Sequence, residues 1–223
     1  MNGICEVAAE NDYDIIISMI DENDLSQVHR LVSNRKVDGV IVSHAAGNSM
    51  EQDYLKNNDI PFVVIGPSSD PDTVSVDNRN QEASEELTSI LLMKGVHRLT
   101  MFGGKEEYNV TGSRYNGYVD AHRKAKIGID DKIVFMGMDD VICSMVLGSL
   151  REKQIKIPNE IKVVSLYDSR NLEYNNPSIT SVRFDTKRLG RLACVKLLKL
   201  LGKWMEEDTV PLSYQVILRE STQ

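Results

Sequence analysis

Short, nearly continuous apolar runs recur along the chain and constrain its fold more than any other feature. They lie at residues 15–17, 40–42, 62–65, 99–102 and 162–166, with a further candidate at 132–136. Continuous apolar strands are covered on both faces, whereas strictly alternating strands bury one face only. Stretches with helical spacing lie between these runs, at 25–32, 82–94, 141–153 and 189–204. Strands that alternate with helices predict an α/β fold with parallel, doubly wound sheets.

The charge of the chain argues against nucleic-acid binding by these residues themselves. The 223 residues include 33 acidic and 26 basic side chains, for a formal net charge of −7. Phosphate backbones are bound by clustered Lys and Arg, and no such stripe is visible in the sequence. No apolar run approaches the roughly 20 residues that cross a bilayer, and residues 1–6 do not resemble a signal peptide. We therefore expect no membrane partner.

The cysteines and histidines give no support to a metal site or to catalysis. The three cysteines, Cys5, Cys143 and Cys194, are scattered, which favours neither disulfides nor zinc and indicates the reducing cytoplasm. The histidines have no metal-ligand spacing, and we expect surface or hydrogen-bonding roles for all of them: His29, His44, His97 and His122. The sequence also lacks a nucleophile elbow, a Walker loop and a dinucleotide fingerprint. We expect no enzyme, no cofactor and no metal.

One interval between elements is shorter than this fold class requires. The strand candidate at 132–136 runs almost directly into the helix at 141–153. Parallel neighbours need a crossover of about a dozen residues or more. The chain also starts in a helix-like stretch at 3–10, with no strand before it. We expect residues to be absent at the start and near Gly137; the alternative is a naturally shorter fold.

An ordered set of short motifs resembles the lactose/galactose-repressor family of bacterial transcriptional regulators. The segments at 37–42 and 60–66 resemble the second and third strands of that family, and Val76-Asp77-Asn78 resembles its Asp-Asn signature. Further motifs follow in family order at 95–104, 114–118, 139–140, 157–161, 176–182, 189–190 and 218–222. Each motif is weak by itself, but together they span nearly the whole chain. The spacing around 77–80 and 103–114 most resembles maltose-operon repressors.

The resemblance implies the fold of periplasmic sugar-binding proteins, with two Rossmann-like, parallel-sheet subdomains. The N-terminal subdomain would consist of 1–95 and 178–204, and the C-terminal subdomain of 96–177 and 205–223. A helix-turn-helix headpiece would lie upstream, because this chain contains none. Such a core binds a sugar effector, forms a homodimer and acts on operator DNA through the headpiece.

Polar residues after a predicted strand are candidate sugar ligands. A sugar site needs donors and acceptors that match adjacent hydroxyls, and ligands in open α/β sheets lie beyond the carboxyl ends of strands. Asp77, Asn78 and Asn80 follow such a strand, and the resemblance implies effector contacts there. The alternative is that they cap the helix at 82–94.

Arg114 is the strongest single candidate. It lies three residues before Gly117, as does the family's arginine, and the resemblance implies that it reaches sugar hydroxyls. A guanidinium fork suits two adjacent oxygens better than the point charge of a lysine. The alternative is a structural ion pair.

The remaining candidates depart from the family pattern. Asp139 replaces the usual asparagine, and it could accept sugar hydroxyls or cap the helix that follows. Tyr167 and Asp168 end the strand at 162–166, where the family often has paired acidic or amide groups. Tyr167 could stack on a sugar face instead.

These residues predict the effector-binding and dimerisation core of a sugar-responsive repressor. The resemblance implies maltose or a maltodextrin as the effector. A transport-type sugar-binding protein of the same fold is the first alternative, although the free cysteines and the repressor-like ending at 218–222 argue against it. A Rossmann-type enzyme is the second, and it would need a catalytic base and a cofactor fingerprint.

Overall fold

The computed structural model divides the chain into two compact units. It describes residues 1–19, 24–43, 50–68, 70–96, 99–104, 108–129, 140–206 and 210–223. Unit 1 consists of Met1–Asp77 and Asp185–Leu212, and unit 2 of Asn78–Phe184 and Ser213–Gln223. The chain therefore passes from one unit to the other at three points: Asp77/Asn78, Phe184/Asp185 and Leu212/Ser213.

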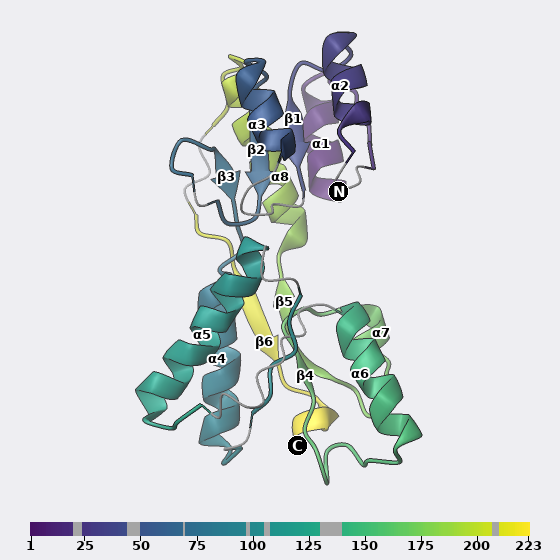
Figure 1. Cartoon of the computed structure of the whole chain (residues 1–223), viewed down its shortest axis with the longest axis vertical. Coiled ribbons are helices and arrows are strands. Elements are labelled where there is room, and N and C mark those ends of the chain that lie inside the picture. The colour runs from purple at the N-terminus through teal and green to yellow at the C-terminus, as the bar shows by residue number, and fades with distance from the viewer. Residues whose placement is uncertain are drawn as a thin grey trace. The chain divides into compact units, whose positions relative to one another are not determined.

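Unit 1 is built on a parallel sheet with helices on both faces (Figure 1). Its described strands, in spatial order, are β1 (Val40–Val42), β2 (Phe62–Ile65) and β3 (Ser75–Val76). Its described helices are α1 (Asn2–Glu10), α2 (Ser26–Ser33), α3 (Met50–Asn57) and α8 (Thr186–Leu200). This is the arrangement that continuous apolar strands predict.

The central strand of unit 1 explains why its apolar run is continuous. Side chains alternate between the two faces of a strand. Val63 packs with Leu189 of α8 on one face, and Val64 packs with Val28 of α2 and Leu55 of α3 on the other. Val63 and Val64 are both 0% exposed, so each face needs its own apolar residue.

Unit 2 also has a sheet between two helical layers (Figure 1). Its described strands are β4 (Val164–Ser165), β5 (Thr180–Phe184) and β6 (Tyr214–Ile217). Its described helices are α4 (Asn80–Met93), α5 (Asn109–Ala125), α6 (Asp140–Glu152), α7 (Arg170–Glu173) and the short 3₁₀ helix Glu220–Thr222. Strand β5 runs parallel to β4 and antiparallel to β6.

The two faces of the unit 2 sheet meet different helices. Val182 and Phe184 of β5 belong to a core that includes residues of α4 and α5. Ile179 belongs to a second core with residues of α6 and α7. Because side chains alternate along β5, Ser181 and Arg183 lie on the face opposite Val182 and Phe184. This division decides which candidate residues lie together.

The predicted fold class is confirmed, but two predicted strands are wrong. The runs at 40–42 and 62–65 are β1 and β2, and the run at 162–166 contains the shorter β4. Residues 15–17 form no strand: Ile15, Ile16 and Ile17 are 38%, 51% and 64% exposed, and no described strand pairs with them. Residues 99–102 pack inward through Met101 but join no described ladder. The candidate at 132–136 and the predicted gap near Gly137 lie outside the described residues.

The helix predicted at 189–204 ends earlier than the sequence indicated. Helix α8 stops at Leu200 rather than at Trp204. Gly202 has a φ of 81°, a left-handed conformation that glycine adopts easily, and its N–H donates to the Lys199 carbonyl at 3.0 Å. Trp204 lies beyond this stop and is 89% exposed.

The unit boundaries also differ from the predicted ones. Helix α4 was expected in the N-terminal subdomain, but it packs on α5 and belongs to unit 2. Strand β5 was expected to return to the first subdomain, yet it pairs with β4 and β6 in unit 2. Apolar periodicity marks these elements without showing which sheet they join.

Candidate functional site

A buried polar cluster lies where α4 and α5 begin in unit 2. Arg114 of α5 is only 8% exposed, and Asn80, the first residue of α4, is 3% exposed. The Arg114 Nε donates a hydrogen bond of 2.9 Å to the Asn80 Oδ1. The structure thus brings together two predicted site residues that lie 34 positions apart in the sequence.

Several contacts fix the orientation of this arginine. The Asn80 Nδ2 donates to the backbone oxygen of Asn78 at 3.2 Å, so both ends of the Asn80 amide are engaged. The Ser84 hydroxyl donates to the backbone oxygen of Arg114 at 2.6 Å. The Arg114 guanidinium carbon lies 5.9 Å from the centre of the Phe184 ring, within the range of a cation–π contact. A preorganised guanidinium can select a ligand by geometry as well as by charge.

Two buried oxygens near this cluster have no hydrogen-bond partner among the described residues. They are the Asn78 Oδ1 and the Thr111 Oγ1. Thr111 is 2% exposed and lies three residues before Arg114, one helical turn away on α5. A buried polar atom left unpaired costs about 1–3 kcal/mol, so a ligand that supplies a donor is favoured here. Sequence reasoning missed Thr111, although its spacing from Arg114 could have indicated it.

The helix-capping alternative for the Asp77 segment is not what the structure shows. Helix α4 begins at Asn80 with Arg79 at the N-cap position, and no side chain caps it. Asp77 is half-buried and has an interaction partner of its own. Asn80 thus holds Arg114 and does not cap the helix, and the ligand roles of Asp77, Asn78 and Asn80 stay predictions.

Asp168 belongs to a different network, on the other face of the unit 2 sheet. Its carboxylate accepts hydrogen bonds from Ser181 at 2.5 Å, Arg183 at 2.8 Å and Arg219 at 2.8 Å. A second Arg183 nitrogen lies 2.7 Å away. A carboxylate has about four lone-pair positions, and these donors use them. The described structure thus gives Asp168 protein partners and does not group it with Arg114, and its ligand role stays a prediction.

The surroundings of Asp168 stabilise its ionised form. Burial by itself raises the pKa of this carboxyl, but hydrogen bonds from Arg219, Ser181 and Arg183 outweigh it and hold the pKa below its ordinary value of 3.8. Ion pairs with two arginines at a buried position are typical of a structural anchor. Charged pairs of this kind are costly to break by removing one partner.

The other two candidates remain predictions. Tyr167 is half-buried and packs against the core shared by α4, α5 and β5. Asp139 lies outside the described residues. Neither has a described contact with Arg114.

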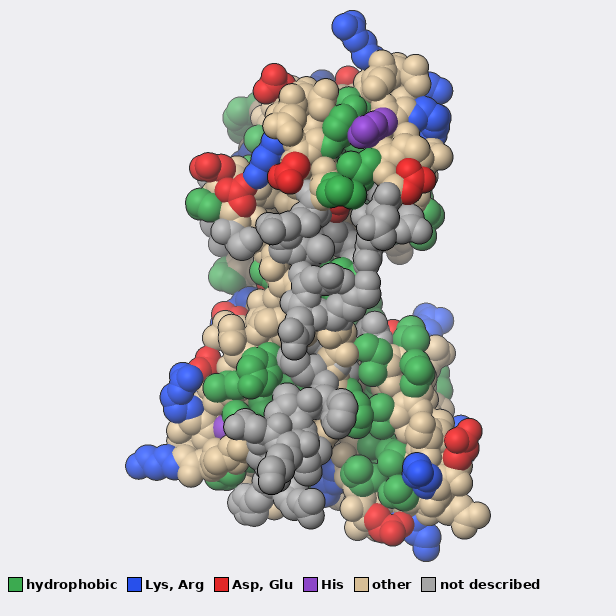
Figure 2. Space-filling model, viewed as in Figure 1, with side chains coloured by type: hydrophobic (Ala, Val, Ile, Leu, Met, Phe, Trp, Pro, Cys, Tyr) green, Lys and Arg blue, Asp and Glu red, His purple; other side chains and the backbone are tan. Residues whose placement is uncertain are grey.

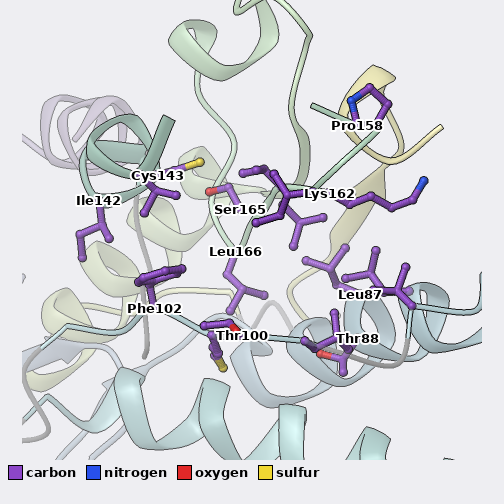
Figure 3. A pocket seen from close by; sticks show the side chains of 18 of the residues that line it. Leu87, Thr88, Thr100, Phe102, Ile142, Cys143, Pro158, Lys162, Ser165 and Leu166 are labelled. Atoms are coloured by element: carbon purple, nitrogen blue, oxygen red, sulfur yellow. The ribbon is translucent and has the colours of Figure 1, made fainter. Parts of the chain in front are cut away.

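Unit 2 also has a cavity of about 380 Å³ between residues of α4, the segment 99–104, α6 and β4 (Figure 3). The side chains around it are mostly apolar, and they include Leu87, Phe102, Ile142 and Leu166. None of the predicted site residues that the structure describes lines it.

The described residues give no sign of metal binding. They contain no group of three or more His, Cys, Asp or Glu side chains that could hold an ion. Cys5, Cys143 and Cys194 are all free thiols. His122 is buried and bonds to the Tyr118 carbonyl at 2.9 Å, and His29 is exposed against a tyrosine ring, as expected of non-ligand histidines. His44 and His97 lie outside the described residues.

None of the described helices is both long enough and apolar enough to span a membrane.

Comparisons with known proteins agree with this fold. The profile of the periplasmic binding protein-like domain matches residues 62–222. The HTH-type transcriptional regulator RegA of Clostridium saccharobutylicum is 27% identical, and the match covers 100% of this chain and 76% of RegA. The regulator MalR of Streptococcus pneumoniae is 31% identical over 60% of this chain, which corresponds to 42% of MalR. A transcription regulator-like protein from Staphylococcus haemolyticus has a TM-score of 0.85 at 26% identity, covering 99% of this chain and 89% of that one.

These relatives are transcriptional regulators, which confirms the expectation that the chain is not an enzyme. The match covers less than half of MalR, so this chain corresponds to only part of that regulator. The chain belongs to the periplasmic binding protein-like domain family, and within it to the effector-binding cores of lactose/galactose-repressor-family regulators.

Proposed function

We propose that this chain is the effector-binding and dimerisation core of a cytoplasmic, sugar-responsive repressor of maltose or maltodextrin genes. One observation carries the proposal: Arg114 is buried and held by Asn80, beside an Asn78 oxygen that lacks a described partner. The name of the relative MalR and the motif spacing support maltose as the sugar. The free thiols support a reducing compartment.

The chemistry of the cluster suits adjacent sugar hydroxyls. A hydroxyl donates one hydrogen bond and accepts others, so it can donate to an amide oxygen and accept from a guanidinium at the same time. The unpaired Asn78 Oδ1 needs a donor, and Arg114 is a donor only. A diol would match both, whereas a simple anion would match Arg114 alone.

The regulatory step follows from linkage. A sugar shifts an equilibrium between two arrangements of the units only if it binds one arrangement more tightly. In the parent regulator, an upstream helix-turn-helix headpiece in each protomer would meet one operator half-site. Sugar binding would then change how well the two headpieces match the operator.

Substituting Arg114→Lys tests the site. Lysine keeps the charge but loses the fork and the Nε donor to Asn80, so maltose should bind about 10-fold to 100-fold more weakly, as expected for one or two charge-assisted hydrogen bonds. Isothermal titration calorimetry with maltose, maltotriose, glucose and sugar phosphates measures this loss.

Arg123→Lys is the matched control, because Arg123 lies on the same helix with a 73% exposed side chain. It should leave affinity unchanged. Equal affinities in the wild type and in both variants would place the sugar elsewhere, and a folded wild type that binds none of these sugars would reject the effector assignment.

Helix α6 carries the surface that we propose for the homodimer. Val141 and Met145 are 64% and 68% exposed and lie one turn apart. At Gly148, the next position of this stripe, a Cβ would meet nothing within 4 Å, so a second helix could approach closely. Figure 2 shows apolar side chains gathered over this part of unit 2. Exposed apolar stripes of this kind mark interaction surfaces.

The charges on α6 favour a second copy as the partner. Asp140 lies in its first turn and Arg151 in its last turn. When two copies of a helix pack antiparallel about a two-fold axis, the acidic end of each faces the basic end of the other. Two intermolecular Asp140–Arg151 pairs would then flank the apolar stripe.

Charge exchange tests this interface. Asp140→Arg and Arg151→Asp should each weaken the dimer, because each places like charges opposite one another, and the double variant should restore it. Met145→Asp should weaken it by at least about 10-fold. Sedimentation equilibrium measures the dimer constant. Met93→Asp, at a 79% exposed methionine of α4, is the control; if it weakens the dimer as much as Met145→Asp does, α6 is not the interface.

A further inference from the structure

Two rings and two guanidinium groups form a continuous stack inside unit 2. The Arg114 guanidinium lies 5.9 Å from the Phe184 ring centre. The Phe184 ring lies 6.2 Å from that of Tyr214, tilted by 57°. The Arg79 guanidinium covers the Tyr214 ring at 5.6 Å. All three separations fall within the ranges of cation–π and aromatic contacts.

Three members of this stack lie beside the points where the chain passes between the units. Phe184 is the last residue before the second passage, and Tyr214 is the second residue after the third. Arg79 is the second residue after the first passage. The fourth member, Arg114, belongs to the candidate site. The stack therefore joins that site to all three passages through contacts within unit 2 alone.

Further contacts hold the middle of the stack. Phe184 and Tyr214 lie directly opposite each other in the β5–β6 pair. The Tyr214 hydroxyl donates a hydrogen bond to the Glu86 carboxylate of α4, and burial together with this carboxylate raises the pKa of Tyr214 to about 12. The Arg79 Nε contacts Glu82 at 3.2 Å, also on α4. Closely packed side chains transmit a displacement because the interior leaves little empty volume.

We infer that Phe184 and Tyr214 are positioning residues that couple the state of Arg114 to the three inter-unit passages. A ligand that draws the guanidinium away from Phe184 weakens the first contact of the stack. The rings then repack, and the segments attached to them at 184–185 and 212–214 shift with them. This inference rests on the proposed function for its sugar, but the stack can be tested without any sugar.

The sugar-free test uses hydrogen exchange of backbone amides at 78–80, 184–186 and 213–215, measured by NMR. Arg114→Lys should raise exchange at all three segments by about 10-fold, which corresponds to about 1.4 kcal/mol in the free energy of local opening. In a Tyr214→Leu background, Arg114→Lys should have little further effect at 213–215 and a reduced effect at 78–80, where the direct hydrogen bond from Arg114 to Asn80 remains a second route. Tyr214→Phe keeps the ring and should preserve the response, which a purely structural role of the hydroxyl would not explain.

A second variant, Arg79→Gln, tests the stack without removing a buried ring. Arg79→Gln removes only the outer end of the stack, at a side chain that is 48% exposed. It should reduce the response at 78–80, where the direct Arg114–Asn80 hydrogen bond remains, and leave that at 184–186 intact. Tyr174→Leu, at a 79% exposed tyrosine, is the control and should suppress neither.

The sugar-dependent test adds maltose to the same variants. Maltose should alter exchange at all three segments in the wild type, less at 78–80 and 213–215 in the Tyr214→Leu variant, and less at 78–80 in the Arg79→Gln variant. Failure of maltose to bind rejects the proposed sugar, and the sugar-free responses still decide the coupling. Equal Arg114→Lys responses in the wild-type, Tyr214→Leu and Arg79→Gln backgrounds would overturn it.

Discussion

Gly117→Ala is expected to destabilise the chain by about 3 kcal/mol or more, because overpacking against backbone leaves little room to relax. A Cβ on Gly117 would lie 2.1 Å from the Gln81 carbonyl oxygen and 2.9 Å from the Glu85 backbone nitrogen. Both neighbours are main-chain atoms of α4, so the helices α4 and α5 would have to separate. Urea unfolding followed by circular dichroism measures the change.

Gly112→Ala provides the matched control on the same helix. A Cβ there meets nothing within 4 Å, so only helix propensity changes. Alanine is favoured over glycine inside a helix by up to about 1 kcal/mol, and this variant should be slightly more stable than the wild type. Similar unfolding midpoints for the two variants would contradict the α4–α5 packing described here.

Arg219→Met is expected to destabilise the chain by about 3 kcal/mol, because it removes the more buried of the two arginines that pair with a buried carboxylate. The Asp168 and Arg219 side chains are 5% and 10% exposed, and they lie 2.8 Å apart. Arg123→Met, at a 73% exposed ion pair, should cost less than about 1 kcal/mol. Equal losses in these two variants would show that the Asp168 network is not an anchor.

The pH dependence of this anchor has a defined sign. The pKa of Asp168 is lower in the folded chain than its ordinary value of 3.8. Its contribution to stability is therefore complete above that value and is lost as the pH falls through the folded pKa. The stability difference between the wild type and Asp168→Asn should shrink below about pH 4. A difference that grows on acidification would contradict the assignment.

The sequence predicted the fold class and most elements because continuous apolar runs and helical spacing are local signals. Helices α2, α4 and α6 lie within two residues of their predicted bounds. The exposed run at 15–17 was misread, since an apolar run indicates a strand only where a neighbouring strand can pair with it. The sequence placed a strand just before Asp77, where β3 lies, but it did not identify β5 as a strand, because its partners β4 and β6 are distant in the chain.

The candidate site was predictable in part, and for a similar reason. The family resemblance predicted Asn80 and Arg114 as site residues, and the structure joins them by a hydrogen bond. The sequence could not show that Asp168 points to the opposite face of the sheet, because that depends on the pairing of β4 with β5. Phe184 was missed, since its place beside Arg114 arises from packing, and Thr111 was missed although its helical spacing from Arg114 could have indicated it.

A crystal structure of the chain with saturating maltose tests most directly whether a sugar binds at Arg114. Sugar hydroxyls should then lie within about 3.2 Å of the Arg114 guanidinium and the Asn78 Oδ1, the usual limit of such hydrogen bonds. Maltose bound away from Arg114, for example against the apolar walls of the cavity in Figure 3, would contradict this assignment.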